Sequence, residues 1–202
     1  MLRMSIEVTS DSTHAALRAL AEQTRELMDA VAATDADDAE LIAVTEEVRA
    51  LTERLARARR AKAEVGHPRW LMGNAVVGAA NPFAPPIEIE HVPGGGVRAE
   101  HVFRRLHEGP PGLVHGGVSA MVLDHLLGVA VGAAGRAGLT ASLTIAYRAP
   151  VPYGVPVVLT AEHTRSEGRK SWADGRIAHQ DGTVLVEATG LFVTPTWFPR
   201  TG

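Results

Sequence analysis

The stretch HGGVSAMVLDHLLGVAVGAAG, residues 115–135, decides the fold. It is apolar almost throughout, and a helix that is apolar on all sides is normally buried. The exception is Asp124, near the middle of the stretch. A buried carboxylate without compensation costs several kcal/mol, so we expect Asp124 either to have local hydrogen-bond partners or to serve a function.

Strand patterns surround this helix. Two precede it, an alternation that begins at Ile87 and a second from Val97 to Phe103, separated by the turn VPGGG. Four follow at residues 139–152, 155–166, 171–180 and 183–195. Their short links imply antiparallel pairing. The sequence therefore predicts an α+β fold in which an antiparallel sheet of five or six strands wraps one helix and buries it on every side.

The first strand after the helix carries two kinds of side chain. Strand alternation predicts Leu143, Ile145 and Tyr147 on one face. The same alternation predicts that three polar side chains share the opposite face: Thr140, Ser142 and Thr144.

Residues 1–65 differ from the rest of the chain. Two amphipathic helices are predicted there by the three- and four-residue spacing of apolar positions. These positions are Leu17, Leu20, Thr24, Leu27 and Val31, and then Leu41, Val44, Val48, Leu51, Leu55 and Ala58. Ser10 or Ser12 is the expected cap of the first helix, and Asp35 or Asp37 that of the second. The pattern predicts a helical hairpin, acting as a structural arm or as a lid.

A segment rich in glycine, proline and asparagine, residues 66–86, reads as a linker. The expected organisation is thus an N-terminal helical arm at 1–65, a linker at 66–86 and a sheet-and-helix domain at 87–202.

Composition narrows the classes of function. The net charge is −3 and the arm is acidic, so we expect no nucleic-acid partner. There is no cysteine, which excludes disulfides and thiolate chemistry. The histidines lack metal-ligand spacing, so we predict no metal site. Phosphate-loop, dinucleotide and Gly-x-Ser-x-Gly motifs are absent. With neither a signal peptide nor a transmembrane run, we expect a cytoplasmic protein without membrane association.

The start of the apolar helix offers chemistry of its own. The first N–H groups of a helix have no intrahelical partner, and glycines at positions 116 and 117 leave them open to a ligand. Such donors can hold a carbonyl oxygen that becomes an oxyanion. Asp124 lies about 12 Å along the axis from Gly116, too far to act at the same helix start. Two antiparallel copies of the helix would bring Asp124 of one chain opposite Gly116 of the other.

Three neighbouring side chains have two interpretations each. His115 is either a site residue or the cap of the helix. Thr140 is either a hydroxyl that orients water or an ordinary strand threonine. His125 projects about 100° away from Asp124, which favours a core role.

Four blocks of the sequence, taken together, resemble the hotdog-fold acyl-CoA thioesterases of the phenylacetate-pathway and mammalian thioesterase-superfamily type. The resemblance runs from about Asn81 to Thr194 and leaves the arm outside. The blocks, in family order, are GPPGLVHGGVSAMVLDHLLG, LTASLTIAYRAPVPYGVPV, EGRKSWADGRI and DGTVLVEATGLFV.

This resemblance implies a hotdog domain that dimerises into a continuous sheet, in some members as a dimer of dimers. It implies that Asp124 is the catalytic carboxylate, as general base or as nucleophile, and that the amide of Gly116, or else Gly117, polarises the thioester carbonyl. His115 and Thr140 match site positions of one branch of the family. Another branch uses an asparagine before the helix, where this chain has HEGPPG.

The resemblance also implies residues that bind the substrate. Arg169 and Lys170 in EGRK match a turn near the coenzyme A phosphates, and Arg148 and Arg165 are weaker candidates. Asn81 matches the loop that leads into the acyl site. No cofactor is expected, because coenzyme A is part of the substrate. The alternatives are a non-catalytic acyl-CoA-binding or regulatory protein and, with less support because its Asp/His motif is missing, a hydratase.

Overall fold

The computed structural model describes residues 2–58, 71–93, 95–136 and 138–197, with side chains from residue 14 onward. Its elements are α1 (Leu2–Ala33), α2 (Asp38–Ala56), β1 (Glu90–His91), β2 (Val97–Val102), the short 3-10 helix η1 (Arg105–His107), α4 (Gly116–Ala133), β3 (Leu139–Tyr147), β4 (Pro156–Glu167), β5 (Lys170–His179) and β6 (Val184–Val193). The strands form one antiparallel sheet in the order β1-β2-β4-β5-β6-β3. The predicted α+β fold, with an antiparallel sheet of five or six strands, is confirmed, and the sheet has six.

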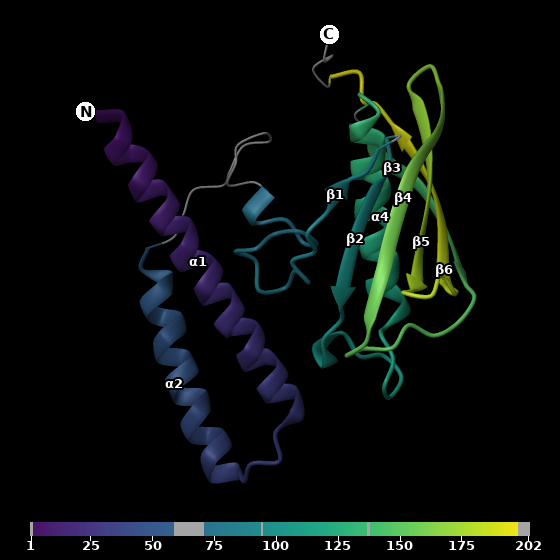
Figure 1. Ribbon diagram of the computed structural model, residues 1–202. Helices are drawn as coiled ribbons and strands as arrows, with labels where there is room; N and C mark the ends of the chain where they lie inside the picture. The colour runs from purple at the N-terminus through teal and green to yellow at the C-terminus, as the bar shows by residue number, and fades with distance from the viewer. Residues whose placement is uncertain (1, 59–70, 94, 137, 198–202) are drawn as a thin grey trace.

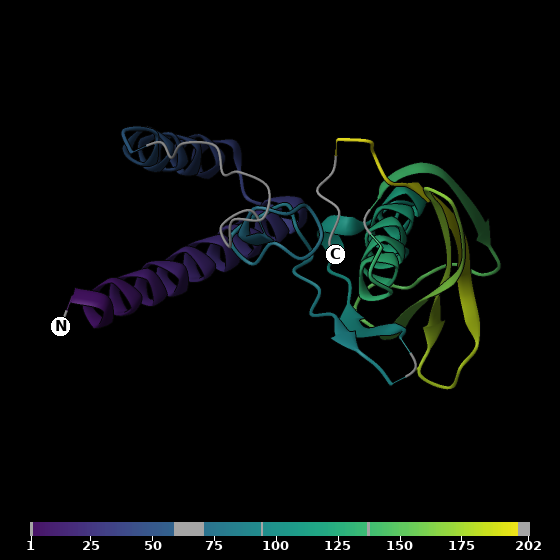
Figure 2. The same ribbon diagram turned by 90° about the horizontal axis from the view of Figure 1, so that it is seen from above.

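The sheet curves around α4, as Figures 1 and 2 show. The helix face that meets the sheet is fully buried, with Val122, Leu123, Leu126 and Leu127 among its residues. The expectation of burial on every side was wrong, because one curved sheet covers only one side of a helix. The other face of α4, hereafter the open face, is half-buried or exposed and comprises Gly117, Val118, Met121, Asp124, His125, Gly128 and Gly132.

Among the described helices, α4 alone is long and apolar enough to cross a membrane by length and composition. The core helix of a water-soluble domain passes the same test, and α4 carries the hydrophobic core on its sheet-facing side.

Strand β3 lies at one edge of the sheet and contains a β-bulge. Thr140 pairs with Phe192, and Ser142 pairs with the very next residue back along β6, Leu191. The extra residue, Ala141, reverses the alternation of side chains. The predicted common face for Thr140, Ser142 and Thr144 was therefore wrong. Thr140 points toward α4, whereas Thr144 lies on the outer face of the sheet.

The first strand is shorter than its sequence pattern indicates. The alternation from Ile87 predicts a strand there, but β1 comprises only Glu90–His91. Two prolines, at positions 85 and 86, precede Ile87 and have no N–H to give to a strand partner. Ile87 instead donates its N–H to the carbonyl of Val76 and buries its side chain in the core.

The N-terminal hairpin is present, with α1 and α2 joined at residues 34–37. The predicted cap of the second helix is confirmed, since Asp37 Oδ1 accepts a hydrogen bond of 3.0 Å from the N–H of Glu40. The predicted caps of the first helix were wrong, because α1 begins at Leu2 and includes both Ser10 and Ser12. Serine lowers helix stability by only a fraction of a kcal/mol, too little to stop a long helix.

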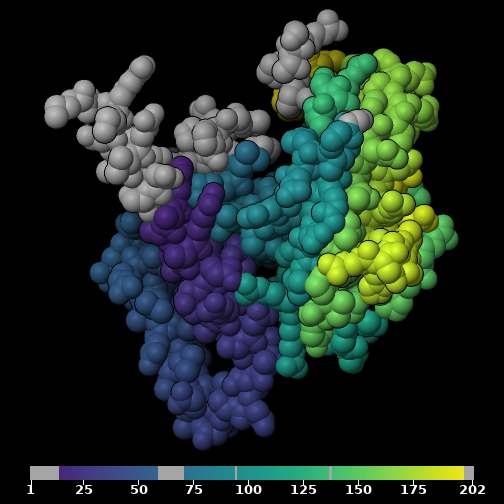
Figure 3. Space-filling view, viewed as in Figure 1, coloured from purple at the N-terminus to yellow at the C-terminus, as the bar shows by residue number. Residues whose placement is uncertain are grey.

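Helix α1 is anchored to the segment that precedes the sheet. Arg25 is only 3% exposed, and its guanidinium donates to the carbonyls of Ala79, Asn81 and Ala84 at 3.0–3.2 Å. A buried guanidinium is stable only when its donors are paired, so these carbonyls fix α1 against the loop. Figure 3 shows the arm lying along one side of the domain.

Candidate functional site

The carboxylate of Asp124 is oriented by a hydroxyl from the neighbouring strand. Thr140 Oγ1 donates a 2.8 Å hydrogen bond to Asp124 Oδ1. The bulge at Ala141 makes this hydrogen bond possible, because it turns the Thr140 side chain toward α4. Asp124 is half-buried on the open face, so one carboxylate oxygen is held and the group faces away from the chain's own core. The structure thus brings together two of the predicted site residues.

The start of α4 is organised by His115 and Tyr147. His115 is the N-cap, and its Nδ1 accepts a 3.0 Å hydrogen bond from the N–H of Gly117. Because that amide is occupied, the geometry favours Gly116, whose N–H has no acceptor within the helix, as the donor to a ligand. Tyr147 donates its hydroxyl to the carbonyl of Gly116 at 2.8 Å. The roles assigned to His115, Gly116 and Gly117 stay predictions.

Within one chain, Asp124 and Thr140 lie far from His115 and Gly116. Asp124 and Thr140 lie about two helical turns from the start of α4, where His115 and Gly116 lie. A site that uses both the carboxylate and the amide therefore needs a second copy of α4 in antiparallel orientation.

Sequence reasoning missed Tyr147 as a site residue. Alternation placed it with the apolar face of β3, but its ring reaches the start of α4 and its side chain is exposed. A Cβ added to Gly116 would lie 3.1 Å from the Tyr147 hydroxyl oxygen. This close approach gives a packing reason for glycine at position 116.

A chain of hydrogen bonds joins the arm to the helix start. Asp29 of α1 accepts from the N–H of Leu106 at 3.2 Å and also pairs with Arg104. The N–H of His115 donates to the carbonyl of His107, the last residue of the same short 3-10 turn, at 2.9 Å. The position of the α4 N-terminus thus depends in part on α1.

Glu22, one turn from Arg25, strengthens the same contact by pairing with both Arg104 and Arg25. Burial raises the pKa of Glu22, but the two arginine hydrogen bonds outweigh it and hold the pKa below its usual value. Glu22 therefore remains an anion where the arm meets the domain.

Two histidines near these groups are neutral. Burial lowers the pKa of His125, and the neighbouring Asp124 carboxylate opposes that shift without reversing it. Burial lowers the pKa of His107 as well, with Asp29 raising it and Arg104 lowering it. Neither side chain therefore adds a positive charge at neutral pH.

The predicted basic turn lies between β4 and β5. Gly168, with φ of +56°, makes the turn that Arg169 and Lys170 follow, and both side chains are exposed. Arg136, just after α4, donates to the carbonyl of Gly168 at 3.5 Å and adds a third cation that sequence reasoning missed. Arg165 lies nearby, 3.6 Å over the ring of Trp172. Arg136 carried no signal in the sequence, since only the folded chain brings it to this turn.

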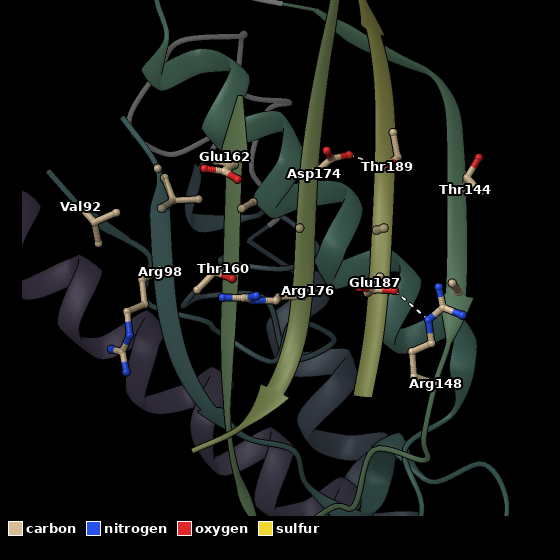
Figure 4. A pocket seen from close by; sticks show the side chains of 16 residues that line it. Val92, Arg98, Thr144, Arg148, Thr160, Glu162, Asp174, Arg176, Glu187 and Thr189 are labelled. Atoms are coloured by element: carbon tan, nitrogen blue, oxygen red, sulfur yellow. Dashed lines mark hydrogen bonds and ion pairs between the residues drawn. The ribbon is translucent and has the colours of Figure 1, made fainter. Parts of the chain in front are cut away.

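Two other predicted binding residues lie elsewhere. Arg148 pairs with Glu187 at 2.8 Å on the outer face of the sheet, as Figure 4 shows. The side chain of Asn81 holds its own loop together. It donates to the carbonyls of Gly73 and Asn74 and accepts from the N–H of Phe83. Neither side chain joins the Asp124–Thr140 pair.

A concavity on that outer face is lined by rows of charged and hydroxyl side chains. It is separated from Asp124 by the sheet itself. Within the described residues no group of three histidines, cysteines or carboxylates has metal-site geometry.

Comparison with known proteins agrees with the fold. The sequence profile of the Thioesterase superfamily matches residues 111–186. The crystal structure of a thioesterase superfamily protein is 37% identical, with a TM-score of 0.82 over 88% of this chain and 90% of the other. The chain belongs to the thioesterase superfamily. A match of this extent takes in much of the helical arm as well as the hotdog domain.

More limited matches connect the chain to other superfamily members. Acyl-coenzyme A thioesterase THEM4 of Xenopus laevis is 39% identical over 89 residues, which are 43% of this chain and 39% of that protein. The chain therefore spans well under half the length of the curated relative it matches. A hypothetical thioesterase of Streptococcus pneumoniae, solved with coenzyme A, shares the fold at 22% identity and a TM-score of 0.50 over 53% of this chain and 86% of that one.

Proposed function

We propose that this protein hydrolyses an acyl-CoA thioester to a carboxylic acid and coenzyme A, at sites that two copies of the chain share. The observation that carries the proposal is the Asp124 carboxylate, held by Thr140 on the open face of α4. Membership of the superfamily supports thioester chemistry, and the THEM4 proteins are named acyl-coenzyme A thioesterases.

In the proposed reaction the thioester carbonyl oxygen accepts a hydrogen bond from the N–H of Gly116. The positive end of the α4 dipole adds to this stabilisation as the oxygen becomes an oxyanion. Gly116 meets the geometric requirement because its N–H lies in the first turn, where no intrahelical acceptor competes.

Asp124 can act in either of two ways, as a general base or as a nucleophile. As general base it takes a proton from water while the water oxygen attacks the carbonyl carbon. The tetrahedral intermediate then expels the coenzyme A thiolate, which is protonated to the thiol. As nucleophile its carboxylate attacks the carbonyl carbon and expels the coenzyme A thiolate, which takes up a proton, and water then hydrolyses the resulting mixed anhydride to the acid and the free carboxylate. A single turnover in ¹⁸O-labelled water separates these roles, because only the nucleophilic route can leave label in the Asp124 carboxylate.

The second copy supplies the other half of each site. Strand β3 is an edge strand with exposed Leu139 and Tyr147, and the open face of α4 carries Met121 and three glycines. An edge strand and a half-exposed apolar helix face are surfaces that a protein normally covers. Antiparallel pairing of two copies covers both surfaces and directs Asp124 at the partner's helix start.

The coenzyme A phosphates are assigned to the turn at Gly168. Arg136, Arg169 and Lys170 gather three exposed cations there. Arginine and lysine side chains of this kind recognise phosphate.

The decisive experiment is hydrolysis of short, long and aromatic acyl-CoAs by the wild type and two variants. We expect Asp124→Asn to lose at least about 100-fold in kcat, the scale of general-base catalysis, while retaining fold and ligand binding. Asp174→Asn is a matched control, because Asp174 also accepts from a threonine, Thr189, but on the outer face. Unchanged turnover in Asp124→Asn would refute the mechanism. Tight binding without hydrolysis of any acyl-CoA by the wild type would favour a non-catalytic binding protein.

A further inference from the structure

The imidazole ring of His115 is held by a hydrogen bond that decides which of its nitrogens carries the proton. Its Nδ1 accepts a 3.0 Å hydrogen bond from the N–H of Gly117. A backbone N–H can only donate, so Nδ1 is unprotonated and the proton of the ring lies on Nε2. The side chain is exposed, and among the described residues nothing accepts a hydrogen bond from Nε2. The ring therefore presents a donor at the start of α4.

Two glycines give the His115 ring its place. A Cβ added to Gly109 would lie 2.8 Å from the Cα of His115 and 3.2 Å from Cδ2 of its ring. A Cβ added to Gly117 would lie 3.1 Å from Nδ1. A side chain at position 109 would collide with the backbone of His115, and one at position 117 would crowd the ring. The orientation of the ring thus depends on the absence of a side chain at both positions.

Tyr147 acts on the same hydrogen bond through a single peptide group. Its hydroxyl donates to the carbonyl of Gly116 at 2.8 Å. That carbonyl and the N–H of Gly117 belong to one planar peptide unit. Because hydrogen bonds in a chain polarise one another, the bond that the carbonyl accepts makes the N–H a stronger donor. The hydroxyl of Tyr147 therefore strengthens the bond from Gly117 to Nδ1 of His115.

We propose that Tyr147 is a positioning residue, which acts through the Gly116–Gly117 peptide to keep the proton of His115 on Nε2. The consequence for catalysis rests on the proposed thioesterase function. In this form His115 can donate a hydrogen bond to the substrate, but it cannot take up a proton at Nδ1 without losing the cap of α4. Removal of a proton from water is thus left to Asp124. Helix cap and site residue, the two interpretations of His115, then describe one geometry.

The tautomer is measured by NMR spectroscopy of the full chain with ¹⁵N-labelled histidine at mildly alkaline pH, without any acyl-CoA. His115→Asn identifies the ring signals of His115, because asparagine also caps a helix. We expect the wild-type ring to carry its proton on Nε2. Tyr147→Phe keeps the aromatic ring and removes only the hydroxyl. In this variant we expect faster hydrogen exchange at the Gly117 amide and a mixture of both ring tautomers.

The matched control is Tyr153→Phe, which removes the hydroxyl of the other of the two tyrosines in the chain. The Tyr153 side chain packs against the hydrophobic core. This substitution should leave the His115 ring signals and the Gly117 amide unchanged, and kcat within about twofold of the wild type.

A double-mutant cycle on kcat shows whether Tyr147 acts through His115. With His115 present, Tyr147→Phe should lower kcat by about three- to tenfold with KM little changed, the scale of one neutral hydrogen bond. In the His115→Asn background the same substitution should change kcat by less than about twofold, because the ring that Tyr147 positions is gone.

Three outcomes would overturn the proposal. The first is a wild-type His115 ring with its proton on Nδ1. The second is a ring and a Gly117 amide that Tyr147→Phe leaves unchanged. The third is an equal fall in kcat in both backgrounds, which would show that Tyr147 acts on another group. If the wild type hydrolyses no acyl-CoA, the proposed function fails, and the NMR measurement still decides whether Tyr147 sets the tautomer.

Discussion

Replacing Thr140 with valine removes the hydroxyl that holds Asp124 and little else. Valine has nearly the shape of threonine and suits a strand. The bond that is lost joins a hydroxyl to a carboxylate at 2.8 Å. Hydrogen bonds to charged groups contribute about 1.5–3 kcal/mol, and the exposure of Thr140 places this one at the lower end because water competes.

A loss near the lower limit corresponds to about a tenfold fall in rate, since about 1.4 kcal/mol changes a rate tenfold. We expect kcat to fall by about this factor with KM little changed, because the hydroxyl orients the carboxylate and not the substrate. The assay is steady-state hydrolysis of the best acyl-CoA from the screen, followed through release of the coenzyme A thiol.

The matched control for this substitution is Thr144→Val, on the same strand but beyond the bulge and on the outer face. It should leave kcat within about twofold of the wild type, as surface substitutions usually do. Equal effects of the two substitutions, or none from Thr140→Val, would refute the role assigned to the bulge and to Thr140.

Three further substitutions test other parts of the site and its supports. Gly116→Pro removes the N–H at a position where proline suits a helix, and should lower kcat by about 10²–10³. Gly116→Ala adds the same Cβ beside Tyr147 but keeps the N–H, so it measures the cost of that contact alone and should lose less than the proline variant. Asp29→Ala should speed amide hydrogen exchange at residues 104–117 and lower kcat several-fold, and Glu26→Ala on the exposed side of α1 should do neither. Burial lowers the pKa of His101 to about 4. Between pH 4 and 6.5 the unfolded chain therefore binds a proton at His101 more readily than the folded chain does. The wild type should lose up to about 3 kcal/mol of free energy of unfolding as the pH falls through that range. In urea unfolding at pH 7 and pH 4.5, His101→Phe should lose less free energy of unfolding between the two pH values than the wild type does. An equal loss in both proteins would show that His101 is not the cause.

The central helix and the antiparallel pairing of the strands could be predicted because each depends on local pattern, whereas the pairing of β3 with β6 in place of its chain neighbour β4 could not. Residues 115–135 are apolar on all faces, and short links between strands leave antiparallel pairing as the simple solution. The position of Asp124 on the open face could not be predicted. That face is defined by where the sheet stops covering α4, which no periodicity of the helix itself records.

Other features of the site depend on contacts between distant segments. The bulge at Ala141 changes which way Thr140 points, and a one-residue irregularity leaves no mark on an alternating pattern. Arg136 reaches the turn at Gly168 only after the sheet forms. Arginine is usually a surface residue, and nothing in the sequence indicates that Arg25 is buried. In the structure it lies among the carbonyls of a loop more than fifty residues away.

Each proposed site combines Asp124 of one copy with the α4 N-terminus of the other. The direct test is co-expression of Asp124→Asn and Gly116→Pro chains with different tags, followed by purification of the heterodimer. Each homodimer is expected to be inactive. In the heterodimer one site carries both defects and the other carries none, so it should retain roughly half of the wild-type kcat per dimer. A heterodimer as inactive as its two parent homodimers would contradict the shared site.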